Sequence, residues 1–523
     1  MAEFSSLINN NYIYVDKTEF VNRLLTDSRH HLLLSRPRRL GKTLLIDTIE
    51  EVLTGRRELF SGLEIDKLRG ENYWPRSHVL RMNLNPFTGD PSSLDMRLAN
   101  CLRRFANPRG INLTSTCAAD SLIELLETMH SNYNKIPLIT RHINLSDNIK
   151  ADIQKIDVLI DEYDSPVINN LTNSSYLKTA KSTLHSFYNA LKSCEDLSDR
   201  IFITGITKFA QLSAFSALNN LDDISFDENY AAICGFTDTD ITKYYYPHLQ
   251  NTLKKLQQNT HFGPSFTFEK LIKRIADWYD GYSWDGINHV INPLSLNYFL
   301  INNRFDNYWS QTGGTNFLDQ MNIKDNIFST VFQGKPTFSG SLAVQDAGNA
   351  DPISVMLQTG YLTVRSQKIS KEISRLYLTV PNKEVGMTIM NNYIHSHVEP
   401  IIEHATDAFN IKMCNKFSEV FFKRQSNNAE IFLSKIFSSI PYSLHLPFEA
   451  FYHSLLFSIF RTAQVDAVPK VNKANGIIDL VVTSQEYGIM VTEIKYAKSN
   501  AKITEDSNVD DKKRATKITE KDK

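Results

Sequence analysis

Hydrophobic positions in the first 240 residues follow two spacings. Short apolar runs are typical of buried strands, and they occur at 32–34, 79–84, 157–164 and 200–207. Between them, apolar residues recur three or four positions apart, as in SSLDMRLANCLRRFA at 92–106, which is typical of an amphipathic helix. Strands that alternate with helices predict βαβ units and a mostly parallel sheet.

The pattern changes after about residue 236. Polar-aromatic helical patterns take over, including FEKLIKRIADWYDGY and PLSLNYFLINNRF. Strand-like runs such as YLTV and RLYLTV follow near 350–385, and a last α/β stretch runs from FYHSLLFSIF to MVTEIKYA. The residues from about Lys498 are charged and poor in apolar side chains, so we expect a disordered tail.

Composition narrows the classes of protein. With 523 residues, the chain is long enough for about three domains. The net charge of −1 gives no general attraction to nucleic acid or anionic membranes. Five scattered cysteines without a CxxC pair argue against a disulfide framework or zinc site. Because the sequence has no signal-peptide pattern and no apolar stretch long enough to span a bilayer, we expect a soluble, cytoplasmic protein.

The segment HLLLSRPRRLGKTLLIDTI predicts a phosphate-binding loop between a strand and a helix. Gly41 allows close backbone approach to a phosphate, Lys42 supplies a positive charge, and Thr43 offers a hydroxyl to Mg²⁺. Arg36 stands where the usual motif has its first glycine, and Arg38 and Arg39 add further charge for phosphate binding. A basic turn that happens to contain Gly-Lys-Thr is the alternative.

The segment VLIDEYDSP predicts the acidic partner of this loop. A carboxylate at the tip of a buried strand can hold Mg²⁺, and the next carboxylate can activate water. We therefore assign Asp161 to Mg²⁺ and Glu162 to the general base, with Asp164 as a third acid that orients the loop. Solvated acids at a strand end are the alternative.

The strand RIFITGIT carries two threonines that could sense a γ-phosphate. For Thr204 we favour the role of an ordinary β-branched strand residue. For Thr207 the sensor and strand roles are balanced, so we include it among the nucleotide-binding candidates. No arginine finger is identified.

Several separate blocks resemble one family. YVDKTEFVNRLL, LLLSRPRRLGKTLLIDTI, VLIDEYDSPV, YAAICGFTDTDI, DWYDGYSWDGINHVINPLSLNYFL and LQTGYLTV are similar, in this order, to AAA-ATPase-like proteins whose C-terminal domain belongs to the PD-(D/E)xK nuclease superfamily. Arg36 belongs to that family's RPRR form of the loop. The family hallmark at 278–282 is an aromatic cluster around a glycine, and we expect it to serve packing rather than catalysis.

The resemblance implies an α/β fold class with a P-loop NTPase parallel sheet. We predict an ATPase domain at 1–236, a helical winged-helix-like region at 237–345, a mixed α+β connector at 346–445, a PD-(D/E)xK nuclease-like domain at 446–497, and a disordered charged tail at 498–523.

The nuclease-like end contains the expected D…ExK pattern. Asp479 and Glu493 would hold a metal ion, and Lys495 would steady the attacking water, on a hairpin that turns near 484–487. However, Ile477 stands where the family has an arginine, and KVNKA lacks the family's upstream glutamate. The charged tail also cannot add a packed layer. These departures predict a truncated domain, with nuclease activity left open.

We therefore expect an ATP-binding, Mg²⁺-dependent ATPase, a hydrolase whose nucleotide state controls the nuclease-like domain. A metal-dependent DNA endonuclease regulated by ATP is one alternative, with DNA bound by the C-terminal domain. A non-catalytic scaffold controlled by ATP is the other. The sequence identifies no protein partner and no oligomeric state.

Overall fold

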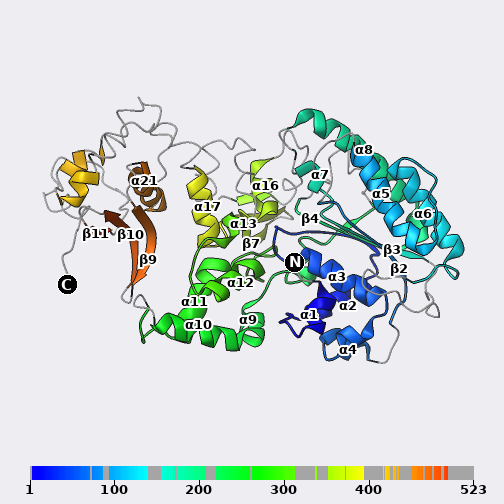
Figure 1. Ribbon diagram of the computed structural model, residues 1–523, viewed down its shortest axis with the longest axis horizontal. Coiled ribbons are helices and arrows are strands. Elements are labelled where there is room, and N and C mark those ends of the chain that lie inside the picture. The colour runs from blue at the N-terminus through cyan, green and yellow to red at the C-terminus, as the bar shows by residue number, and fades with distance from the viewer. Residues whose placement is uncertain are drawn as a thin grey trace. The chain divides into compact units, whose positions relative to one another are not determined.

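Four apolar runs predicted as strands pair in one parallel sheet (Figure 1). The sheet also contains a fifth, two-residue strand. Its order is β2-β3-β4-β1-β5. The strands are β1 (His31–Ser35), β2 (His78–Asn83), β3 (Ile156–Asp161), β4 (Ser198–Gly205) and β5 (Asp222–Asp223). The α/β prediction with a parallel sheet is therefore confirmed for this part of the chain.

The computed structural model describes most of the first half of the chain and parts of the second half. The described residues are 3–70, 74–85, 93–138, 155–168, 170, 173–207, 220–258, 262–312, 336–338, 351–370, 373–393, 416, 418–424, 428–431, 433–434, 449–462, 466–473, 476–484 and 488–492.

Helices lie on both sides of the parallel sheet. Figure 1 shows α3 with α1, α2 and α4 on one side, and α5, α6 and α8 on the other. Helix α3 packs on β2 and β3, whereas α6 packs on β3 and on α5. The bounds of these helices are α1 (Phe4–Asn9), α2 (Thr18–Thr26), α3 (Lys42–Leu53), α4 (Glu64–Arg69), α5 (Leu94–Ala106), α6 (Ala118–Asn132), α7 (Ser165–Ile168) and α8 (Ser174–Ser193).

The parallel pairing brings the carboxyl ends of the strands to one edge of the sheet. Strand β4 lies between β1 and β3, and Leu33 and Ile160 both have Ile203 as a register partner. The loop that follows β1 and the acids that end β3 therefore face a common edge, with the end of β4 between them.

The chain divides into two units that are made of interleaved segments. The first unit contains residues 1–246, 279–297 and 330–382. Besides the parallel sheet, it holds an antiparallel sheet of order β6-β8-β7. Its further elements are α9 (Asp238–Tyr244), β6 (Pro336–Phe338), α16 (Pro352–Thr359), β7 (Thr363–Ser370) and β8 (Ile373–Thr379).

The second unit contains residues 247–278, 298–329 and 383–523. Near its C-terminal end, α21 packs on β9 and β10, and these strands form an antiparallel sheet of order β11-β10-β9. Helix α12 (Pro293–Asn302) is divided between the two units after residue 297. The remaining elements lie wholly or almost wholly in the second unit; they are α10 (Tyr246–Gln258), α11 (Phe268–Tyr279), α13 (Tyr308–Thr312), α17 (Lys383–Tyr393), α21 (Glu449–Thr462), β9 (Asp466–Lys473), β10 (Gly476–Ser484) and β11 (Gly488–Thr492).

Within the described residues, no helix combines the length and the apolar character that crossing a membrane requires.

Candidate nucleotide-binding site

The loop between β1 and α3 leads through Gly41 into the first turn of α3. Gly41 precedes the first helical residue and has φ 105°, a left-handed conformation that glycine adopts without strain. Leu40 accepts a backbone hydrogen bond from Gly235 at 2.9 Å, which fixes the loop from outside. Lys42 and Thr43 then open the first turn of α3, where free backbone N–H groups favour anions.

Lys42 is buried, and its ammonium group is surrounded by oxygen atoms. Its Nζ donates to the carbonyl oxygens of Arg36 at 3.0 Å and Pro37 at 3.2 Å. The same Nζ lies 3.5 Å from Oε1 of Glu162, which directly follows β3. The loop and the acidic strand end therefore meet at this lysine.

Asp161 is fully buried at the end of β3. Its carboxylate accepts hydrogen bonds from Thr204 Oγ1 at 2.9 Å and from Asn83 Nδ2 at 3.4 Å. Burial and the charge of Glu162 raise the pKa of Asp161, while the Thr43 hydroxyl, the charge of Lys42 and the Thr204 hydroxyl oppose the rise. Thr43, which lies in the first turn of α3, is thus close enough to Asp161 at the end of β3 to favour its charged form.

Glu162 adopts an unusual backbone conformation. Its φ of 53° is left-handed, which costs a residue other than glycine free energy. Two hydrogen bonds hold this turn, one from Tyr163 N to Thr204 O at 3.0 Å and one from Ser165 N to Glu162 O at 3.0 Å. The side chain is 18% exposed, whereas Asp161 and Asp164 are fully buried, so Glu162 is the carboxylate of the three that reaches solvent.

Asp164 joins the end of β3 to the end of β4. Its Oδ2 accepts hydrogen bonds from Ile206 N at 3.0 Å, from Thr207 N at 2.6 Å and from Thr207 Oγ1 at 2.7 Å. Burial, followed by the charge of Glu162, raises the pKa of Asp164 to about 6. Tyr163 strengthens this junction because its hydroxyl donates to Thr207 O at 2.8 Å.

Arg36 points into the protein beneath the loop. Its guanidinium donates to the carbonyl oxygens of Ser35 at 2.9 Å, Ser225 at 2.7 Å and Tyr230 at 3.0 Å. The guanidinium also lies 3.9 Å from the centre of the Trp284 ring. The residue is fully buried, and burial lowers its pKa to about 10. Arg38 and Arg39 are half-buried farther along the loop.

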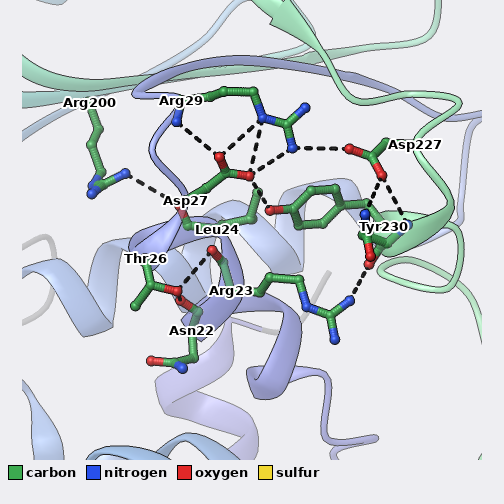
Figure 2. Close-up of polar contacts among 10 residues, drawn as sticks. Asn22, Arg23, Leu24, Thr26, Asp27, Arg29, Arg200, Asp227 and Tyr230 are labelled. Atoms are coloured by element: carbon green, nitrogen blue, oxygen red, sulfur yellow. Dashed lines mark hydrogen bonds and ion pairs between the residues drawn. The ribbon is translucent and has the colours of Figure 1, made fainter.

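A polar network holds the 227–230 segment, which supports Arg36. Figure 2 shows Asp27 joined to Arg29 and to the hydroxyl of Tyr230, while Arg29 also pairs with Asp227. These contacts measure 2.8 Å, 2.8 Å and 3.0 Å, respectively. The Arg29 guanidinium is the first cause that holds the pKa of Asp27 well below its usual range. The network ties the connection between α2 and β1 to the segment after β5.

The nuclease-like candidates are described only in part. Asp479 lies in β10, which pairs with β11 so that Leu480 faces Thr492 and Ser484 faces Gly488. The predicted hairpin is confirmed. Glu493 and Lys495 lie outside the described residues.

Two contacting residues of the site were missed or undervalued by sequence reasoning. Asn83 ends β2 directly beside Asp161 in the register, and its position after the run VLRM is a signal that could have revealed it. Thr204, favoured above as an ordinary strand residue, donates its hydroxyl to Asp161. Trp284 had no signal in its local sequence that linked it to the loop.

Comparison with known proteins finds a family model that matches the N-terminal part of the chain. The family model described as "Predicted AAA-ATPase" matches residues 1–215, a range that contains the loop and all three acids. A protein of Azotobacter chroococcum mcd 1, named "Uncharacterized protein in vnfD 5'region", is 28% identical over 482 residues, or 90% of this chain and 83% of that protein. Residues 1–215 thus carry a predicted AAA-ATPase domain, which suggests nucleotide binding.

Proposed function

We propose that this chain is an ATP-binding, Mg²⁺-dependent ATPase whose nucleotide state controls its nuclease-like C-terminal domain. The observation that carries the ATPase part is the meeting of two elements. Lys42 and Thr43 open α3, and they lie close to Asp161, which ends β3, and to Glu162, which follows it. A cation, a hydroxyl and two carboxylates at the carboxyl edge of a parallel sheet are the groups that phosphoryl transfer requires.

The oxygen donors at this edge fit a magnesium ion. Mg²⁺ in phosphoryl-transfer sites uses one or two protein carboxylates together with waters and phosphates. Within the described part of the chain, no group of three His, Cys, Asp or Glu side chains could hold a metal by itself. The Asp161 carboxylate and the Thr43 hydroxyl would hold the ion, which supplies neutralising charge to the phosphates when it is bound.

The remaining roles follow from charge and exposure. Lys42 would exchange its carbonyl partners for phosphate oxygens, which also frees Glu162 from its ion pair. Glu162 would then orient and deprotonate the attacking water, because it is the acid that reaches solvent. Thr207, whose hydroxyl donates to Asp164, would turn that donor to a γ-phosphate oxygen. Gly41, Arg38 and Arg39 would complete the phosphate-binding loop, and Arg36 would support it from below.

Two substitutions test the ATPase proposal. We expect Lys42→Ala to abolish ATP binding, measured by titration calorimetry, because the phosphates lose their cation. Glu162→Gln should bind ATP and release no phosphate. Glu19→Gln is the matched control, since Glu19 is 55% exposed and pairs only with Arg23 in the same helix turn among its described ion pairs. Tight ATP binding by the Lys42 variant, or normal turnover by the Glu162 variant, would contradict the proposal.

A metal-dependent DNA endonuclease remains the second candidate, favoured by the β10–β11 hairpin. Leu480 faces Thr492 at the end of the hairpin away from its turn, and Asp479 directly precedes Leu480. We therefore propose Asp479, Glu493 and Lys495 as its site, with Asp479 and Glu493 as metal ligands. Cleavage of plasmid DNA with Mg²⁺ or Mn²⁺ should disappear in Asp479→Ala. If no condition gives cleavage but ATP is still bound, the C-terminal domain serves as a non-catalytic scaffold.

A further inference from the structure

The segment DGYSWDG at 280–286, which overlaps the hallmark at 278–282, contacts the phosphate-binding loop through Trp284 although it lies far along the chain. Both belong to the first unit, which takes in residues 279–297 as well as 1–246. We propose that Trp284 is a positioning residue for nucleotide binding, which acts by holding Arg36 and through it the ammonium group of Lys42. The inference rests on the proposed ATPase function and gives a residue just beyond the hallmark at 278–282 a role in it.

Arg36 is the link between Trp284 and the lysine. Its side chain lies over the Trp284 ring, while its main-chain oxygen accepts the hydrogen bond from Lys42 Nζ. Its main-chain nitrogen donates to Gly205 O at 3.1 Å, next to Thr204, whose hydroxyl reaches Asp161. A shift of Arg36 would therefore displace Lys42 relative to the acidic strand end.

The chemistry and the burial of the contact between the Arg36 guanidinium and the Trp284 indole both favour a strong cation–π attraction. Trp gives the strongest cation–π partner, and the attraction grows when water is excluded. Here Arg36 is fully buried and Trp284 is 6% exposed. No carboxylate pairs with the Arg36 guanidinium in the described ion pairs, so carbonyl oxygens and the ring face carry its charge.

Trp284 is itself held on a fixed turn. On one side, Ser283 N donates to Thr363 Oγ1 at 2.7 Å, and Val364 N donates to Ser283 O at 3.1 Å. On the other side, Asp285 Oδ1 accepts hydrogen bonds from Ile287 N and Asn288 N, both at 2.8 Å. Burial of the ring together with these backbone bonds leaves Trp284 little freedom to follow a displaced loop.

A second residue of the same unit, Gly360, packs closely against the phosphate-binding loop. A Cβ atom added at Gly360 would lie 2.8 Å from Cβ of Pro37 and 3.0 Å from its Cγ, so only a glycine fits there without a shift. Gly360 also has φ 91°, which favours glycine. The loop is thus contacted at two successive residues, Arg36 and Pro37, by side chain and backbone from the second half of the chain.

The test is a set of substitutions at Trp284 in the full-length chain. We expect Trp284→Ala to weaken binding of ATP by about tenfold, the order that a desolvated cation–π contact implies. Trp284→Phe should retain affinity within about threefold. Trp284→Leu should lose as much as the alanine variant, because it fills space without a ring. The Phe and Leu pair decides the question even if the alanine variant fails to fold.

Two controls separate positioning from general stability. Phe60 is a buried aromatic residue stacked on Phe4, away from the loop in its described ring contacts, so Phe60→Ala should leave ATP affinity unchanged. A double-mutant cycle with Arg36→Lys should be non-additive, since both substitutions break the same link.

The outcomes are distinct. Wild-type affinity in folded Trp284→Leu, an equal loss in Phe60→Ala, or strict additivity of the Arg36 and Trp284 substitutions would overturn the positioning role. Failure of the wild-type protein to bind ATP would instead defeat the proposed function itself.

Discussion

The alanine substitution of Gly205 tests the geometry of the proposed catalytic edge most directly. Gly205 ends β4, beside the threonine that donates to Asp161. An added Cβ would lie 2.4 Å from Cδ1 and 2.5 Å from Cε1 of Tyr163, and 2.7 Å from Oδ1 of Asp164. Ordinary contact begins near 3.4 Å, so the ring would have to move by about 1 Å.

The surroundings leave little room for that movement. Tyr163 is 1% exposed, its hydroxyl is bonded to Thr207 O, and its carbonyl oxygen accepts a hydrogen bond from Tyr188. Overpacking of a core typically costs about 1–3 kcal/mol. For a domain of roughly 200 residues, each kcal/mol lowers Tm by about 2–4 °C. We therefore expect Gly205→Ala to lower Tm by several degrees and to displace the turn that carries Glu162.

Thermal unfolding and phosphate release together measure these effects. The ATP turnover rate should fall more than the stability loss explains, because Tyr163 directly follows the proposed base. In a Tyr163→Val background the ring atoms are absent, so the added cost of Gly205→Ala should shrink. A Gly205→Ala protein with unchanged Tm and turnover would refute the close approach, and an undiminished cost in the valine background would refute its cause.

Three further substitutions test the surroundings of the site. Arg81→Met should cost about 3–5 kcal/mol in urea unfolding, because it strips Asp47 and Glu50 of a buried partner that lies at 2.6 and 2.7 Å; a loss under 1 kcal/mol would contradict this. Thr207→Val should lower kcat for ATP hydrolysis by about tenfold with little change in KM, since the proposed contact with the γ-phosphate loses its hydroxyl donor. An unchanged kcat would count against the sensor role. Burial raises the pKa of Asp157 to about 7, so the free energy of unfolding should fall as pH rises from about 4 through 7. Asp157→Asn should flatten this dependence between pH 5 and 8. A pH profile identical to that of the wild-type protein would show that another group titrates.

Local sequence pattern was sufficient to predict the strands of the parallel sheet. The apolar runs at 32–34, 79–84, 157–164 and 200–207 each contain a buried strand, because a strand covered on both faces needs continuous apolar side chains. The last two runs were predicted too long, since β3 ends at Asp161 and β4 at Gly205. Two-residue β5 had no such run and was not predicted. Its pairing with β1 depends on partners elsewhere in the chain.

The directions of individual side chains were harder to predict. A basic residue in a loop normally points to solvent, so Arg36 was read as a phosphate ligand, and nothing in its own segment indicates the Trp284 ring that it meets. The left-handed turn at Glu162 also could not be predicted from its local sequence, since one of the hydrogen bonds that hold it is accepted by Thr204 of β4. Such features depend on long-range packing, which local periodicity does not encode.

The interleaved first unit limits how the protein can be dissected. The range that matches the family model ends at 215, yet Ser225, Tyr230 and Trp284, which contact the Arg36 guanidinium, all lie beyond it. A fragment excised at that border would keep every proposed phosphate-binding residue, but the buried guanidinium of Arg36 would lose these neighbours. The proposed ATPase portion therefore does not end at that border, and its chemistry is best assayed in the full-length chain.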